Sequence, residues 1–516
     1  MSEHRHVNPW LVAVAVMFGT FMEVLDTTVV NVSLPHIAGS LSATIDEATW
    51  ALTSYLVANA IVLPMTGWLA SYFGRKRLLL WSVTGFTLTS FLCGAAPNLA
   101  SLVVFRIMQG LTGGALQPLS QAVLLEAFPP EKRGKAMAFW ALGIVVAPIL
   151  GPVLGGWLTD TYSWRWVFYI NLPVGIASIV MTTLYVFDPP YLRNEQRGID
   201  YWGIGMLIVG IGALQIVLDK GQQDDWFESR FITAFSIISA VTLVALVVHL
   251  LRTKDPVVDL RVFRERSYAV GVFLMTVVGF VLYGSMVLLP ILLQTLLGYP
   301  SMQAGIAMAP RGIGSFLMMP LVGILTGRFD ARKLLAVGLT VAGITLFWLG
   351  ELNLQAGYWD IFWPQLLQGV GLSLLFVPLT TVTMASISPE RMGNATSLFN
   401  LMRNIGGSIG IAVTGTMLSR HRQSVGAVLG GHVTAYDPTS RAMLQQMTAA
   451  FMAAGADAVT ATSRAYAALA GMVARQAAMI SFVTIFRLLG VLFLLLLPLL
   501  LLMKRPRTGG GPVAAH

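Results

Sequence analysis

The sequence is dominated by apolar runs of about 20 residues that recur along nearly its whole length. The runs lie at roughly 10–34, 47–70, 78–96, 99–123, 136–158, 166–187, 201–218, 231–251, 268–291, 302–326, 334–350, 361–384, 395–418 and 480–503. A helix of that length, rising about 1.5 Å per residue, crosses a hydrocarbon core of roughly 30 Å. Charged residues make up only 11% of the 516 residues, against about 25% in soluble domains. We therefore expect an all-α polytopic membrane protein with about fourteen spans.

The connections between the runs alternate in charge. The connections that hold Arg75–Arg77 and Arg332–Lys333 are basic, whereas the 219–228 connection on the other side is acidic. Cytoplasmic loops of membrane proteins carry an excess of Lys and Arg, so both chain termini are expected on the cytoplasmic side. The formal net charge of +9 is therefore attributed to loops at the membrane surface and not to nucleic-acid binding.

Three segments of the first half of the chain recur in the second half at nearly one offset. The matches are Gly67–Arg77 with Gly323–Lys333 at an offset of 256, and Gln109–Gly110 with Gln368–Gly369 and Pro130–Gly134 with Pro389–Gly393 at an offset of 259. Parallel repeats of six spans, with a site between them near the midplane, are typical of alternating-access carriers. We expect a six-helix bundle over 1–190, two inserted helices and a linker over 191–266, and a second six-helix bundle over 267–516.

Two carboxylates interrupt the first apolar run. Glu23 and Asp26 are three residues apart and share one face of a helix, which must look into protein or a water-filled cavity because lipid would not tolerate them. Counted from the outer ends of their spans, Asp26 and Arg106 both lie roughly 12 to 14 Å deep, so they can meet. Such a pair can serve as a proton site or as a static buried ion pair. Glu23 can be a second proton site, the partner of a cationic substrate, or a structural acid.

Other polar residues are candidates for a substrate cavity between the halves. Arg311, roughly 15 Å deep in the tenth run, is expected to face this cavity. Arg403 is expected near the cytoplasmic interface, where a long cationic side chain can reach the headgroups. The cavity candidates are Glu23, Asn31, Gln109, Arg311 and Gln368.

Small residues recur every fourth position in the fifth run. They are Gly143, Ala147, Gly151 and Gly155, and Pro148 and Pro152 interrupt the same segment. Such a stripe lets a second helix approach closely, so it predicts helix packing.

Several of these stretches resemble one transporter family. The segment from Gly67 to Arg77 is similar to the cytoplasmic loop signature of the major facilitator superfamily, and Leu25–Pro35 resembles the first-span motif of its fourteen-span drug:proton antiporters. Trp164–Pro173 supports the same assignment. The loop departs from the family pattern at Ser71 and Tyr72, where Asp and Arg are usual.

The resemblance implies a major facilitator fold that exports hydrophobic or amphiphilic drugs across the bacterial inner membrane in exchange for protons. From the chemistry of the residues themselves, the candidates for proton coupling are Asp26, Glu23 and Arg106. Residues of the conformational motifs would be Gly67, Gly74, Arg75, Gly143, Gly151, Pro152 and Gly155. No cofactor is expected beyond the proton as coupling ion. A rival interpretation is a carrier of the same fold for an endogenous lipid, siderophore or amino acid.

About 60 residues, 419–478, separate the last two runs, which is far more than the roughly 2 to 8 residues that helix connections need. The composition of 441–456 and 461–478 favours helix, so a helical hairpin is expected outside the membrane. The resemblance implies that it lies near a periplasmic adaptor protein and an outer-membrane channel. A lid over the outward cavity is the alternative.

Enzymatic and ATP-driven functions find no support in the sequence. It has neither a Gly-x-x-x-x-Gly-Lys-Ser/Thr phosphate loop nor a His-Glu-x-x-His metal motif, and its 7 His residues are dispersed. We therefore expect neither an enzyme nor a metal site.

Overall fold

The computed structural model describes residues 8–188, 198–434 and 436–503, apart from the side chains of Ile45, Ile149, Pro152 and Ser301. Within these residues the chain forms long α-helices joined by short turns, and no strand. The all-α fold class expected from the apolar runs is therefore confirmed.

The helices follow the order of the apolar runs. In the first half they are α1 (Pro9–Ser40), α2 (Ile45–Ala48), α3 (Trp50–Phe73), α4 (Arg75–Gly94), α5 (Leu99–Gly113), α6 (Leu116–Ala127), α7 (Arg133–Thr161), α8 (Trp166–Tyr169) and α9 (Asn171–Tyr185). The inserted pair is α10 (Tyr201–Lys220) and α11 (Arg230–Arg252). In the second half they are α12 (Arg266–Ile291), α13 (Ser301–Leu325), α14 (Ala331–Leu349), α15 (Tyr358–Met384), α16 (Met392–His432), α17 (Pro438–Ala453) and α18 (Ala458–Leu495).

Length and hydropathy identify 11 membrane-crossing helices among the described residues, or up to 12 if the bent pair Pro130–Pro148 and Val153–Thr161 is one span. Helices α4 and α16, of 20 and 41 residues, are not among them but pack inside the bundle. Each of the fourteen expected runs lies in a helix or in a pair of consecutive helices. A count of fourteen therefore depends on including α4, α7 and α16.

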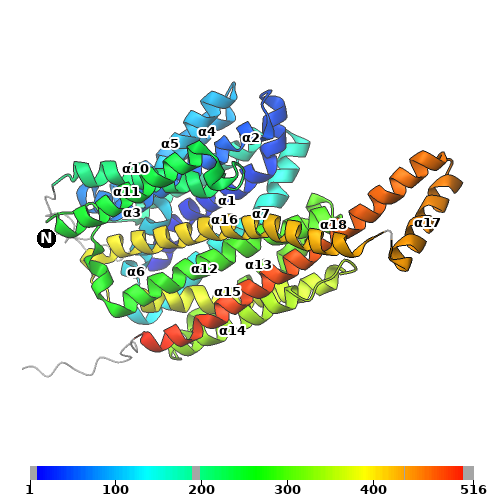
Figure 1. Ribbon diagram of the computed structural model, residues 1–516. Helices are drawn as coiled ribbons and strands as arrows, with labels where there is room; N and C mark the ends of the chain where they lie inside the picture. Colours follow the sequence, from blue (N-terminus) through cyan, green and yellow to red (C-terminus); the bar gives the residue numbers. More distant parts are fainter. Residues whose placement is uncertain (1–7, 189–197, 435, 504–516) are drawn as a thin grey trace, which may run out of the picture.

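Each half packs mainly within itself, and the inserted pair lies across the seam between the halves. In the first half α1 contacts α7 and α9, and in the second half α12 contacts α16 while α13 contacts α15. The halves meet along two seams, where α7 contacts α13 and α3 contacts α16. Helix α10 packs against both α3 and α16, and α11 packs on α10 (Figure 1).

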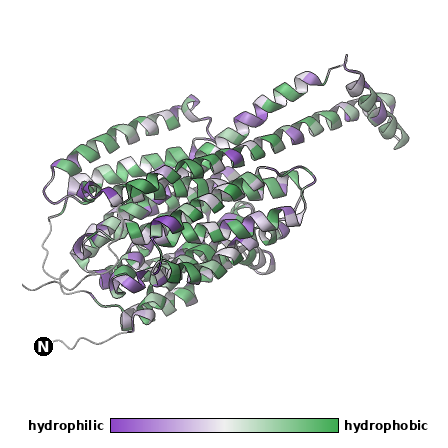
Figure 2. Cartoon of the chain, turned by 90° about the horizontal axis from the view of Figure 1, so that it is seen from below, coloured by the Kyte–Doolittle hydropathy of each residue, from purple (hydrophilic) through white to green (hydrophobic). Residues whose placement is uncertain are grey.

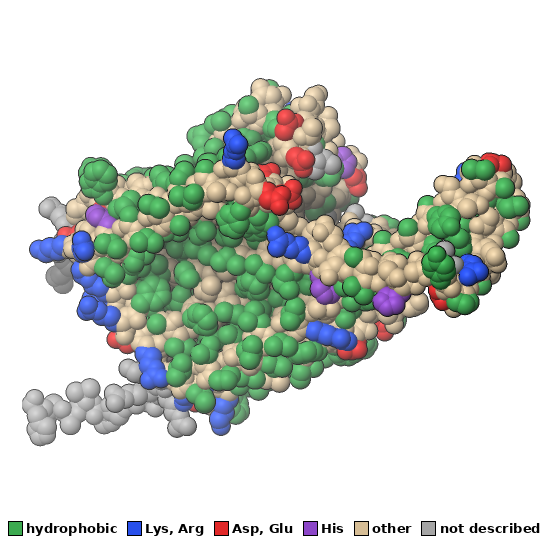
Figure 3. Space-filling view, in the orientation of Figure 1, with side chains coloured by type: hydrophobic (Ala, Val, Ile, Leu, Met, Phe, Trp, Pro, Cys, Tyr) green, Lys and Arg blue, Asp and Glu red, His purple; other side chains and the backbone are tan. Residues whose placement is uncertain are grey.

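The bundle has two distinct ends. We call the end where α1 begins and α18 finishes the terminal face, and the end from which α17 protrudes the hairpin face (Figure 1). Hydrophobic residues follow the bundle helices, and hydrophilic residues concentrate at helix ends and in the protruding hairpin (Figure 2). On the visible surface, Lys and Arg side chains gather at the terminal face beside a broad hydrophobic band (Figure 3). This arrangement fits a bundle that lies across a membrane.

The two halves touch closely near the terminal face. A Cβ on Gly67 of α3 would lie only 2.6 Å from the Asn394 backbone of α16, so only glycine permits this approach. Two residues further along α16, the Thr396 Oγ1 donates to the Pro118 carbonyl of α6 at 3.1 Å. On the second seam, a Cβ on Gly134 of α7 would overlap Thr326 beyond α13. Both seams are thus closed at the terminal face.

The hairpin is continuous with two bundle helices. Helix α16 runs unbroken to His432, well past the end of its apolar run, and α18 runs from Ala458 through the hairpin into the bundle. Only α17 is separate, and it folds back onto α18. The helical character expected for 441–456 and 461–478 is confirmed, but the helices begin and end elsewhere.

Candidate functional site

Asp26 and Arg106 meet in the interior of the first half. The Arg106 Nη1 donates to the Asp26 Oδ2 at 2.6 Å, and both side chains are 0% exposed. The Arg106 Nε donates to the Ala51 carbonyl of α3 at 2.9 Å, and its guanidinium lies 4.2 Å from the centre of the Tyr55 ring. The pair therefore ties α1, α3 and α5 together.

Two amides complete the surroundings of Asp26. The Asp26 Oδ1 accepts hydrogen bonds from the Gln109 Nε2 at 3.1 Å and from the Asn171 Nδ2 at 2.8 Å. Asn171, at the first turn of α9, also donates to the Ser90 Oγ at 2.9 Å. Sequence reasoning gave no site role to Asn171 or Ser90; the only available signal was Asn171 within the Trp164–Pro173 motif. Asp26 is thus enclosed by three protein donors.

Glu23 lies nearby but is much less well satisfied. Its side chain is 4% exposed, and its Oε1 accepts a hydrogen bond from the Asn59 Nδ2 at 2.9 Å. Its Oε2 is enclosed and has no hydrogen-bond partner among the described residues. Gln117 of α6 faces this carboxylate, and the charge of Arg403 from the second half acts on it. The two acids of α1 therefore have different surroundings.

Arg403 lies in the protein interior, so the expectation that it reaches the membrane interface was wrong. Its residue exposure is 3%, and its Nη2 donates to the Gln117 Oε1 of the first half. Helix α16 already begins at Met392, which places Arg403 roughly 16 Å along it. The neighbouring Asn400 Nδ2 donates to the Gln121 Oε1 at 2.6 Å. Arg403 thus forms the deepest of these polar links from α16 to α6.

The five cavity candidates do not converge on one space. Gln109 belongs to the hydrogen-bonded group of Asp26, Arg106, Gln109, Asn171 and Ser90, which we call the Asp26 cluster. Asn31 is exposed on α1. Gln368 is 2% exposed and accepts a hydrogen bond from the Gln365 Nε2 at 3.2 Å. Glu23 lies beside the seam between α6 and α16, and Arg311 is buried in the second half.

The loop motif forms a compact joint at the terminal face. Gly74 has a φ of 87°, the left-handed region that favours glycine, and Arg75 forms an ion pair with Glu126. The two departures from the family pattern make local contacts. Ser71 Oγ donates to the Gly67 carbonyl at 3.0 Å, and Tyr72 is exposed.

The small-residue stripe of α7 packs against α1 within the first half. Cβ atoms added at Gly143, Gly151 and Gly155 would contact Met17, Thr28 and Val29 of α1, respectively. The side chain of Pro152 lies outside the described residues. The stripe therefore sets the distance between α7 and α1, the helix that carries both acids.

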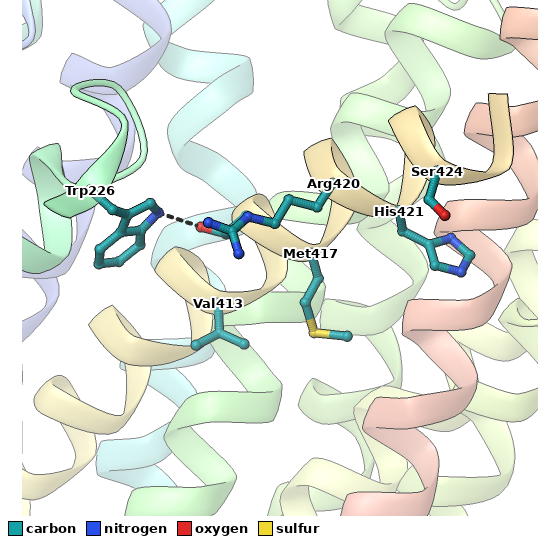
Figure 4. Close-up of a pocket in the computed structure, with 7 residues that line it drawn as sticks. Trp226, Val413, Met417, Arg420, His421 and Ser424 are labelled. Carbon is teal, nitrogen blue, oxygen red and sulfur yellow. Dashed lines mark hydrogen bonds between the residues drawn. The ribbon is translucent and has the colours of Figure 1, made fainter. Parts of the chain in front are cut away.

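A cavity of about 470 Å³ lies beside α16 (Figure 4). It is lined by Trp226, Val413, Thr416, Met417, Arg420, His421 and Ser424. The Trp226 indole N–H donates to the Thr416 Oγ1 at 2.9 Å, which joins the α10–α11 connection to α16. Sequence reasoning did not predict this cavity, because its lining combines a loop and a helix about 190 residues apart.

Comparisons with known proteins agree with this architecture. The family profile of the Major Facilitator Superfamily matches residues 16–411. The chain is 38% identical over 510 residues to the multidrug export protein EmrB of Escherichia coli strain K12, covering 98% of each chain. It is 38% identical over 501 residues to the fatty acid resistance protein FarB of Neisseria gonorrhoeae, covering 97% of each. The crystal structure of the human organic anion transporter MFSD10 matches with a TM-score of 0.61 at 13% identity, covering 96% of this chain and 99% of that one, and shows the fold alone.

Proposed function

The chain belongs to the major facilitator superfamily, a family of membrane transporters and not of enzymes, and from that premise we propose that it is a proton-coupled exporter of amphiphilic drugs. Support for the substrate comes from the export protein that it matches over nearly its whole length. Support for proton coupling comes from one observation, the enclosed Glu23 carboxylate beside the seam between the halves.

The two acids of α1 take different parts in this proposal. Asp26 is bound by Arg106, Gln109 and Asn171, so its charge is already compensated and its oxygens are occupied. Glu23 has a buried oxygen without a donor, and Arg403, the opposite charge that acts on it, donates to Gln117 instead, so the buried anion is only partly stabilised, which is unfavourable. Protonation of Glu23 removes that charge, whereas protonation of Asp26 would break an ion pair. We assign proton exchange to Glu23, and to Asp26 and Arg106 the positioning of α1.

The position of Glu23 connects protonation to the contact between the halves. The anionic carboxylate attracts Arg403 of α16, whose guanidinium is held by Gln117 of α6 next to it. A proton on Glu23 weakens this attraction and favours separation of the seam that is closed in this conformation. Alternating access would follow, because opening at the terminal face requires the loss of these contacts.

The exporter is proposed to lie in the bacterial inner membrane with the terminal face in the cytoplasm. The basic residues gathered at that face support this orientation (Figure 3). We divide it into a bundle over 1–190, the inserted segment 191–266 and a bundle over 267–516. The hairpin, 419–478, would then project into the periplasm, where a periplasmic adaptor and an outer-membrane channel are its proposed partners.

The test is transport by purified protein in proteoliposomes with an imposed pH gradient. Wild type should accumulate a fluorescent amphiphilic drug only when the gradient is present. Glu23→Gln should remove gradient-driven accumulation while retaining drug binding. Glu351→Gln, which neutralises an exposed carboxylate paired with Arg487, is the matched control and should transport normally. Unchanged gradient-driven accumulation by Glu23→Gln would refute the assignment of the proton site.

A second candidate function is export of an endogenous lipid by the same mechanism. The fatty acid resistance protein that the chain matches over 97% of its length favours this alternative. Accumulation of a long-chain fatty acid, but of none of a panel of synthetic drugs, would select it.

A further inference from the structure

Helix α10 joins the two halves along the seam between α3 and α16. At the terminal face these two helices meet directly, where the Gly67 backbone lies against Asn394. Roughly 9 Å from Gly67 along α3, toward the hairpin face, Ile61 faces α10 instead. A Cβ on Gly212 of α10 would lie 3.4 Å from the Ile61 Cδ1 and 3.8 Å from the Val57 Cγ1. The inserted pair therefore takes part in this seam.

The end of α10 is attached to the start of α3. The Thr53 Oγ1 donates to the Asp219 carboxylate, and the Lys220 Nζ donates to the Thr49 Oγ1. The same ammonium group lies 5.2 Å from the centre of the Trp50 ring. Lys220 is only 5% exposed, so these contacts take the place of water around its charge. The first half thus holds α10 at the hairpin face.

Helix α10 and its connection to α11 are also bonded to α16. The Gln215 side chain exchanges two hydrogen bonds with the Ser408 hydroxyl, which donates at 3.2 Å and accepts at 3.0 Å. Roughly 12 Å further along α16, the Trp226 indole N–H donates to the Thr416 Oγ1 at 2.9 Å. One short segment, residues 212–226, is therefore bonded to both halves, and we call it the brace.

The connection from α10 to α11 has a backbone shape that its contacts must maintain. Asp225 and Trp226 have φ angles of 53° and 55°, in the left-handed region that residues other than glycine seldom adopt. Such residues persist where the surrounding structure holds them, and the Trp226 bond to α16 does so here. In addition to the cavity at α16, a second cavity of about 470 Å³ borders the connection on the α3 side. It is lined by Asp46, Glu47, Trp50, Lys220, Gln223 and Asp224. The connection therefore has space to move once its contacts are lost.

We propose that the brace keeps α3 and α16 at a fixed spacing toward the hairpin face and so favours the conformation that is closed at the terminal face. The inference rests on the proposed function, because an exporter must open the two faces in turn. When long helices tilt about a close contact such as Gly67–Asn394, the spacing of their far ends changes. Hydrogen bonds of about 3 Å to both helices cannot all survive such a change. Opening the terminal face therefore requires the brace to release at least one half.

The experiment measures the distance between the halves at the terminal face by double electron–electron resonance. Spin labels are attached through Arg77→Cys in the first half and Glu390→Cys in the second, both at exposed positions. The only other cysteine, Cys93, is replaced by Ser, and the protein is studied in lipid nanodiscs without substrate or a pH gradient. Gln215→Leu combined with Trp226→Phe removes the described side-chain hydrogen bonds from the brace to α16. This double variant should raise the ratio of open to closed distances by about fivefold or more.

Two further variants separate the brace from general loosening of the inserted pair. Ser239→Ala is the matched control, because the Ser239 Oγ donates to the Gly210 carbonyl at 3.0 Å inside the inserted pair, and it should leave the ratio unchanged. Gly212→Ala places a methyl group at ordinary contact distance from Ile61. Added to the double variant, it should lower the ratio again by about two- to fourfold.

Trp226→Phe alone keeps the aromatic ring, so it should shift the ratio in the same direction by a smaller amount and takes the place of the double variant if that protein unfolds. Unchanged distances in these variants, or an equal shift in Ser239→Ala, would overturn the proposal. If the ratio shifts as expected but no pH gradient drives drug accumulation by the wild type, the export function fails and the brace stands.

Discussion

Replacing Asp26 by Asn leaves the shape of the side chain nearly unchanged but removes the charge that faces Arg106. The guanidinium would keep the Ala51 carbonyl and the Gln109 Oε1 as acceptors. It would lose the only carboxylate bonded to it, at a site where both side chains are completely buried. We therefore expect Asp26→Asn to destabilise the first half.

The size of the effect follows from the burial of the pair. Removing one partner of a buried ion pair costs about 3 to 5 kcal/mol, because the other charge is left uncompensated. Removing both with Asp26→Asn and Arg106→Gln should cost clearly less than either single change, because no charge then remains. The exposed pair Arg487–Glu351 gives the scale for comparison, since surface pairs contribute about 0 to 1 kcal/mol.

The assay can use the protein's own reporter. Cys93 is the only cysteine of the chain, is completely buried, and donates from its Sγ to the Gln109 Oε1 at 3.5 Å. Its labelling by a thiol-reactive fluorophore in detergent therefore reports opening of this cluster. If the whole cost falls on that opening, labelling should accelerate by about two to three and a half powers of ten in Asp26→Asn.

The double variant distinguishes this explanation from simple loss of packing. It should label more slowly than either single variant. Single variants that label at the wild-type rate would show that the pair contributes nothing at this depth. A double variant that labels fastest of all would show that shape, and not charge, holds the cluster together.

Three further changes have defined outcomes. Burial alone would raise the pKa of Asp200, but hydrogen bonds from the Gly203 backbone N–H and from His249 outweigh this effect, so the pKa is lowered. Asp200→Ala should therefore lower the free energy of unfolding at pH 7 by about 1 to 2 kcal/mol. This difference, measured by thermal unfolding, should fade as the pH falls below about 4, where the carboxylate becomes protonated. Gly151→Val should overlap α1 and cost about 1 to 3 kcal/mol, whereas Gly156→Val, with open space around it, should be nearly neutral by the same measurement. Replacing 419–478 by a short Gly/Ser connector should leave transport in proteoliposomes intact and reduce drug resistance in cells, and loss of transport in proteoliposomes would instead identify the hairpin as a lid.

The sequence was sufficient for the fold because the fold depends on features that repeat. Apolar runs of spanning length and a duplicated loop motif predict two parallel helical halves, whichever side chains fill them. The same depth reasoning led to the expectation that Asp26 can meet Arg106. This expectation used only the distance of each residue from the end of its helix, which does not depend on how each helix is rotated about its own axis.

Where helix rotation or helix ends mattered, sequence reasoning was incomplete. Asn171 and Ser90 could not be assigned to the Asp26 cluster, because their helices had to be oriented first. Arg403 was expected near the cytoplasmic interface because it lies early in the apolar run that starts near residue 395, and its acceptor, Gln117 of the other half, could not be identified from the sequence. The helix starts at Met392 and continues to His432, since Ala- and Gly-rich polar turns can extend a helix that is already packed.

Helix α16 joins two distant parts of the molecule as one rigid rod. Its 41 residues correspond to roughly 62 Å, from the closed seam at the terminal face to the base of α17. About 44 Å of this length lies beyond Arg403, so a tilt of about 10° around that residue would displace the far end by roughly 8 Å. The same tilt moves the near end of α16, at the seam, by only roughly 3 Å, which is about the length of one hydrogen bond. The displacement of the far end thus exceeds the pitch of one helix turn, about 5.4 Å. The position of the hairpin would therefore differ between the inward-open and outward-open states of the carrier, and would report which side is open.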